Sequence, residues 1–64
     1  MIEIRCNKPR KAARMAVRRA QQAGDKVTVH IQGRTWGTDH DVVLRDVGPG
    51  DSVEAVERRI RELW

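Results

Sequence analysis

Two alternating segments on either side of the Trp-Gly pair at residues 36–37 constrain the fold of this chain more than any other feature. If that pair occupies the two central positions of a tight turn, Ile31 faces Val42 and Val29 faces Leu44. The apolar side chains of both segments then share one face of the sheet. A shift of one residue would turn one set to the opposite face. The sequence therefore predicts a β-hairpin in this register.

The tip of the predicted hairpin combines charge, glycine and an aromatic side chain. The same register places Arg34 opposite Asp39, a favourable cross-strand pair. Gly37 suits a tight turn because glycine readily adopts a positive φ. Tryptophan is an unusual first turn residue, so a longer loop with a bulge at Gly33 or Gly37 stays open. We expect Trp36 to fold back over the sheet edge rather than to serve as an exposed contact point.

The first part of the chain predicts a strand followed by a helix. Residues 2–6 alternate between apolar and charged side chains, which indicates a half-buried strand. Asn7 is the expected N-cap of the helix, Pro9 fits its first turn, and Gly24 suits its C-terminal end. The expected buried stripe recurs at three- and four-residue steps, and it comprises Ala12, Ala13, Ala16, Val17, Ala20 and Ala23.

The last part predicts the second hairpin strand and a second helix. In residues 42–47 the pattern places Val43 and Val47 on the face opposite Val42. Asp51 is the expected N-cap of the second helix, with Glu54 three residues later completing a capping arrangement. The expected buried stripe of this helix comprises Val53, Val56, Ile60 and Leu63.

The length limits what the chain can do. Residues 1–64 form one domain, and a domain of this size rarely encloses a pocket for a small molecule. We therefore expect neither an enzyme nor a cofactor. Cys6 is the single cysteine, and the sequence shows no signal peptide and no apolar run long enough to span a membrane. These features favour a cytoplasmic type of protein.

Positive charge is concentrated in the first part of the chain. Residues 1–24 hold seven Lys or Arg and one Glu, a net charge of +6, whereas residues 25–64 hold six and eight acidic residues, a net charge of −2. Such asymmetry can indicate a nucleic-acid surface, although a solvated helix face is the commoner explanation. The candidate phosphate contacts are Lys8, Arg10, Lys11, Arg14, Arg18 and Arg19.

Two other groups of residues could suggest a metal site or a nucleophilic pair, but strand alternation argues against both. His40 lies between Asp39 and Asp41, but strand alternation points it away from both carboxylates, whereas a metal needs converging ligands. His30 is expected on the polar sheet face and Cys6 on the buried face. A nucleophilic Cys–His pair is therefore excluded by geometry, and we expect no metal site and no catalytic residue.

The expected fold is α+β, a two-layer β-α-β-β-α arrangement with both helices on one face of a three-stranded mixed sheet. The expected strand order is 1-3-2, with the third strand antiparallel to both neighbours. This layout resembles a ferredoxin-like fold that lacks its last strand.

Short loops such as NKP, AGDK and GPGDS, together with consistent patterning, also resemble computationally designed α/β mini-proteins. That resemblance implies a structural scaffold with no selected activity, and the alternative is a small nucleic-acid-binding module that uses the basic helix. Among partners, we expect no membrane and at most weak, non-specific nucleic-acid binding at low salt. A monomer is slightly favoured over a dimer formed through an edge strand.

Overall fold

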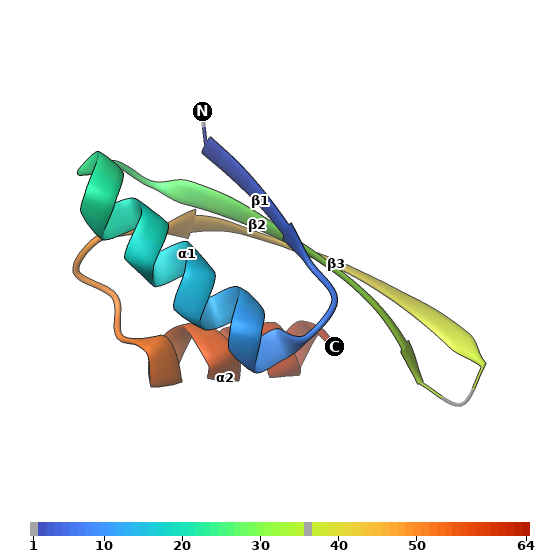
Figure 1. Ribbon diagram of the computed structural model, residues 1–64. Helices are drawn as coiled ribbons and strands as arrows, with labels where there is room; N and C mark the ends of the chain where they lie inside the picture. Colours follow the sequence, from blue (N-terminus) through green and yellow to red (C-terminus); the bar gives the residue numbers. More distant parts are fainter. Residues whose placement is uncertain (1, 36) are drawn as a thin grey trace.

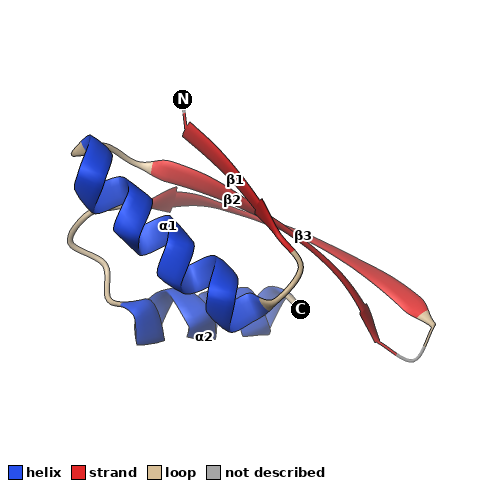
Figure 2. Cartoon of the chain, in the orientation of Figure 1, coloured by secondary structure: helices blue, strands red, loops and turns tan. Residues whose placement is uncertain are grey.

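The computed structural model describes residues 2–35 and 37–64, with the backbone alone at residues 34, 35, 38 and 40. The elements follow the expected β-α-β-β-α order. They are β1 (Ile2–Cys6), α1 (Pro9–Ala23), β2 (Val27–Thr35), β3 (Thr38–Val47) and α2 (Val53–Leu63). Figure 1 shows both helices on one side of a twisted three-stranded sheet, and Figure 2 shows the same two layers by secondary structure. The other side of the sheet, called the open face below, is not covered by a described element.

The strand order is β1-β2-β3, so the expected order 1-3-2 is wrong. β1 and β2 are direct parallel neighbours, with Ile2 opposite Val27 and Ile4 opposite Val29. β3 pairs antiparallel with β2 on its other side. No strand separates β1 from β2, so the split arrangement of the ferredoxin-like layout is not formed.

The observed order has a physical basis in β3. A β-bulge interrupts the pairing of β2 with β3 between Val27 and Val29, and bulges are most easily accommodated at the edge of a sheet. Asp41 is an exposed carboxylate within β3, and charged side chains are also typical of edge strands. In the central position, β3 would have to form backbone hydrogen bonds with a strand on each side, and its irregular backbone would interrupt both sets.

The predicted hairpin register is confirmed. Ile31 pairs with Val42, Val29 with Leu44, and the backbone of Arg34 with that of Asp39. Gly37 has φ = 77°, the left-handed conformation that the tight turn requires of it. The end of the hairpin extends beyond both helices as an arm (Figure 1).

The bulge corrects the expectation for Val47. Simple alternation places Val47 on the open face, but its side chain is fully buried. Val27 pairs with Val47 while Val29 pairs with Leu44, so β3 uses one residue more than β2 across this interval. Asp46 takes up the extra residue with φ = 65°. Leu44 and Val47 therefore both face the helices.

Both helix N-termini differ by one residue from expectation. The N-cap of α1 is Lys8 rather than Asn7, and no side chain caps it. The N-cap of α2 is Ser52 rather than Asp51, and its hydroxyl accepts a hydrogen bond from the Ala55 N–H at 3.2 Å. Asp51 instead closes the preceding turn by accepting a bond from the Gly48 N–H at 2.8 Å.

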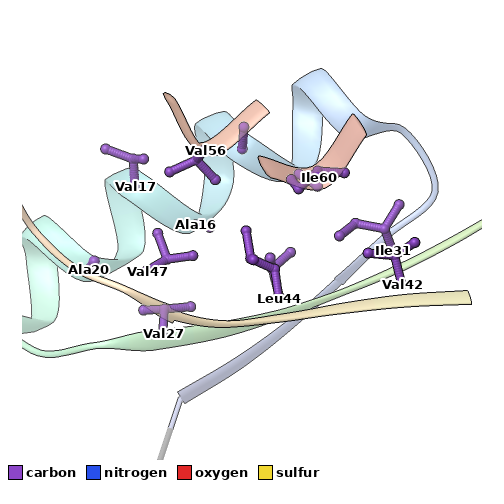
Figure 3. Packing of buried hydrophobic residues seen from close by; sticks show 13 residues of the cluster. Ala16, Val17, Ala20, Val27, Ile31, Val42, Leu44, Val47, Val56 and Ile60 are labelled. Carbon is purple, nitrogen blue, oxygen red and sulfur yellow. The ribbon is translucent and has the colours of Figure 1, made fainter. Parts of the chain in front are cut away.

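The core is built from alanines on α1 and larger side chains elsewhere. Figure 3 shows these side chains packed between the helices and the sheet. Because α1 contributes mainly methyl groups, it can approach the sheet closely, and the larger residues of the strands and α2 fill the remaining volume. The buried residues are Ala12, Ala13, Ala16, Val17, Ala20, Val27, Val29, Ile31, Val42, Leu44, Val47, Val56 and Ile60. Ala23 is exposed and does not belong to the expected stripe.

The C-terminal end of the core depends on Trp64 and Gly33. Leu63 is 57% exposed, so the expected buried stripe of α2 ends at Ile60. Trp64 packs against the core in its place. A Cβ atom on Gly33 would lie 2.0 Å from the Cη2 atom of the Trp64 ring. Gly33 therefore makes room for an aromatic ring, and the hairpin turn is not the reason for this glycine.

Candidate nucleic-acid interface

The basic residues of α1 surround a shallow groove between α1 and the start of α2. Five of the six predicted phosphate contacts line it, together with Met15, Val17, Gln21 and Val53. The five are Lys8, Arg10, Lys11, Arg14 and Arg18. Arg19 lies outside the groove. The groove therefore gathers most of the predicted contacts on one side of the helix.

The geometry of the helix explains this grouping. Arg10, Arg14 and Arg18 are spaced by four residues, so each follows the previous one along the axis by about 6 Å. These three side chains form a ridge next to α2. Val17 and Val53 line the same groove, and Val17 is buried in the core while Val53 packs against it. The result is an apolar floor bordered by guanidinium and ammonium groups.

The six cations take no part in the ion pairs of the described structure. Those pairs join Arg5 to Glu3, Arg59 to Asp51 and Arg61 to Glu57, with His30 beside Asp41 as a further contact. The α1 cations also form no side-chain hydrogen bond with a described residue. Their charges are thus available to an external anion.

The two helices place charge in opposite ways relative to their dipoles. α2 has the stabilising arrangement, with Glu54 in its first turn and Arg61 in its last. α1 has the opposite arrangement. Its first turn contains the cations Arg10 and Lys11 and no acidic residue, and its last turn contains no basic residue. Cations at the positive end of a helix oppose folding by about 0.3–1 kcal/mol each. The charges of α1 are therefore not arranged for stability.

Part of the groove was not anticipated from the sequence. Helical periodicity places Val53 in the buried stripe of α2 and predicts no role for Met15. Met15 is 40% exposed, on a helix whose buried face is otherwise regular. An exposed methionine among arginines was the one available sequence signal, but it is a weak one because single exposed apolar residues are common.

The open face of the sheet holds a separate polar group. Arg5, His30 and Val43 lie side by side on β1, β2 and β3 in the observed register. The imidazole Nε2 of His30 contacts the Asp41 carboxylate, which is opposite Gln32 rather than His30. The contact is therefore diagonal. His30 is the more enclosed partner, with 19% of its side chain exposed against 63% for Asp41.

Cys6 lies on the helix side of the sheet, opposite Ile31, as expected. It is half-buried rather than fully buried, and its Sγ atom lies 3.7 Å from the Lys8 carbonyl oxygen. Cys6 and His30 consequently point to opposite faces. Among the described residues, no three His, Cys, Asp or Glu side chains converge in a way that could hold a metal ion.

The expectation for Trp36 and the rejection of a metal site at His40 concern side chains outside the described residues. Neither described helix combines the length and apolar character needed to cross a bilayer. Comparison with protein-family models, curated proteins and solved structures found no match.

Proposed function

We propose that this protein is a nucleic-acid-binding module that holds a phosphate backbone along the groove of α1. The supporting observation is the placement of the α1 cations. They have no partner among the described residues, and those in the first turn oppose the helix dipole. An anion bound there would receive the field of the side chains and that of the helix N-terminus together.

The Arg10–Arg14–Arg18 ridge suits a repeating anion better than a single small one. Guanidinium groups bind phosphate oxygens through two parallel hydrogen bonds, and three of them in a row can follow successive phosphates. Lys8 and Lys11 extend the positive surface to the start of the helix. The binding energy then comes mainly from release of counterions by the nucleic acid.

This binding would be independent of base sequence. Base-specific recognition of single strands relies on aromatic side chains that stack on bases, and none of the residues that line the groove is aromatic. The apolar residues that line the groove, Met15, Val17 and Val53, provide contact area without hydrogen-bonding groups that distinguish bases. The proposed role is thus that of a binding module rather than of an enzyme.

The test is a titration with random-sequence RNA and duplex DNA at two salt concentrations. The first variant combines Arg10→Gln, Arg14→Gln and Arg18→Gln. The matched control combines Arg58→Gln, Arg59→Gln and Arg61→Gln on α2, which changes the net charge equally. We expect the wild-type log–log salt slope to be about −3 to −5 for that many phosphate contacts. The α1 variant should lose binding and the α2 variant should retain it.

The competing proposal is a designed scaffold without a ligand, and it predicts a different result. In that case only net charge matters, so both triple variants should weaken binding equally, and wild-type binding should vanish near physiological salt. Equal loss in the two variants would refute the α1 interface. Tight binding that survives both high salt and the α1 substitutions would refute both proposals.

A further inference from the structure

We propose that two copies of this protein form a dimer through the exposed edges of their β1 strands, which pair antiparallel about Ile4. The structure motivates this proposal independently of nucleic-acid binding. Within the described residues β1 pairs with β2 alone, so its outer N–H and C=O groups have no ladder partner. Such an edge is a template for another strand. The proposal replaces the slight preference for a monomer that the sequence alone suggested.

The sequence of β1 is complementary to itself in one antiparallel register. When Ile4 faces Ile4 of the second copy, Glu3 faces Arg5 and Arg5 faces Glu3 across the interface. All these charges lie on the open face. Shifting the pairing by two residues in either direction brings Glu3 against Glu3 or Arg5 against Arg5, and like charges directly opposite each other are unfavourable. A shift by one residue would place apolar against charged faces.

The helix side of the same pairing is apolar. Ile2, Ile4 and Cys6 are only half-buried although they pack against the core. In the proposed register Ile4 meets Ile4, and Ile2 meets Cys6 of the second copy. The pairing would therefore cover apolar surface that the single chain leaves partly in water, which is the main favourable contribution to association.

A nearby part of α1 is also consistent with an interface. Met15 lies beside Cys6 in a depression at the end of β1 that is also lined by Arg5, Asn7, Lys11 and Gln32. Met15 is 40% exposed, so it is an apolar side chain left in water beside Arg5 and Cys6 of β1. Because α1 packs over β1 and β2, the two-fold axis would bring α1 of both copies alongside each other on one side of a six-stranded sheet.

The edge of β3 is less suited to the same role. Its backbone is irregular at Asp46, where φ is 65°. The Arg59 Nη2 atom lies 3.5 Å from the Arg45 carbonyl oxygen and donates to it. Bulges and charged side chains are the usual means by which proteins prevent pairing at an edge. β1 is regular over Ile2–Cys6, and its charged residues Glu3 and Arg5 attract rather than repel a second copy in the register about Ile4.

The first test measures the mass of the protein by sedimentation at several concentrations and at an ionic strength of about 0.15 M, which screens the more distant repulsion between the two α1 helices but leaves the adjacent Glu3–Arg5 pairs largely unscreened. Glu3→Arg and Arg5→Glu should each raise the dissociation constant roughly tenfold, because each turns both cross-strand pairs into like charges. The double variant with both substitutions should dimerise like wild type. A mixture of the two single variants should form a heterodimer.

The controls separate this interface from loss of folding and from other surfaces. Glu3 and Arg5 are exposed, and their own contact is 3.4 Å long, so circular dichroism should show unchanged folding in each variant. Val43→Glu introduces a charge on the open face of β3 and should leave the dimer intact. A dimer abolished by this substitution but not by those on β1 would refute the proposal, as would a wild-type protein that stays monomeric at all concentrations.

The second test fixes the register covalently. Ile2→Cys should form disulfides with Cys6 of the second copy under mild oxidation, because the two positions face each other. Within one chain these positions are about 13 Å apart along the strand, too far for a disulfide. The control variant combines Ile2→Cys with Cys6→Ser and should remain uncrosslinked. Equal crosslinking of the two variants, or none in the first, would exclude the pairing about Ile4.

Discussion

Truncation of Ile60 tests whether the core of α2 ends where the structure places it. Ile60 is fully buried and Leu63 is 57% exposed, although both belong to the same apolar stripe of the sequence. Ile60→Ala removes side-chain carbons from a closed environment, which costs about 2–5 kcal/mol through lost burial and the remaining cavity. Leu63→Ala removes a similar group from a solvent-exposed position and should cost less than about 0.5 kcal/mol.

The size of the domain makes the difference measurable. A chain of this length has a free energy of unfolding of roughly 3–10 kcal/mol. For a small domain, the stability falls by about 1 kcal/mol per molar urea. Ile60→Ala should therefore lower the urea midpoint by about 2–5 M, or leave the chain unfolded without urea. Ile60→Val, which costs about 0.5–1.5 kcal/mol, provides a graded variant that stays folded.

The assay is urea unfolding followed by far-ultraviolet circular dichroism, which reports on both helices. The reasoning requires a decreasing order of midpoints from Leu63→Ala through Ile60→Val to Ile60→Ala. Equal midpoints for the two alanine variants would show that the buried face of α2 is not the one described. A larger loss for Leu63→Ala would have the same meaning.

Three further substitutions test local features of the fold. Gly33→Ala should destabilise wild type by about 1–3 kcal/mol because its Cβ overlaps the Trp64 ring, and a double-mutant cycle with Trp64→Ala should remove that cost, as measured by urea unfolding. Asp46→Val should cost about 1–2 kcal/mol because a β-branched residue disfavours φ = 65°, whereas Asp46→Gly should retain the melting temperature. Ser52→Ala should cost about 1 kcal/mol by removing the cap on the Ala55 N–H, and a thermal melt that is unchanged would contradict this assignment.

The hairpin could be predicted from the sequence because local pattern and register agree. Val29, Ile31, Val42 and Leu44 have a single alignment that keeps them on one face, and the structure has that alignment. Val47 could not be placed in the same way. Its burial depends on a bulge at Asp46, and a bulge changes the period of a strand without a distinct sequence signal.

The strand order required information beyond periodicity. The patterns of β1 and β2 are equally compatible with direct pairing and with an intervening strand, because both arrangements bury the same residues. Gly33 and Trp64 also could not be interpreted from local pattern. They are far apart in the chain, and only their contact in the folded protein explains why a glycine occupies position 33 and where the Trp64 ring packs. Five of the six basic residues named from the sequence line one groove, but that groove also depends on Val53 of α2, which the pattern of the first helix does not reveal.

The central position of β2 has a consequence for the dynamics of the chain. Of the three described strands, β2 has neighbours on both sides. Its amide hydrogens between Val27 and Ile31 should exchange with solvent most slowly, at rates set by global unfolding. β2 and β3 follow each other directly in the chain, so their paired residues are close in sequence. β1 pairs with β2 across the whole of α1, as in the pair Ile2 and Val27. The hairpin should therefore form early during folding, and β1, although synthesised first, should be the last strand to join the sheet.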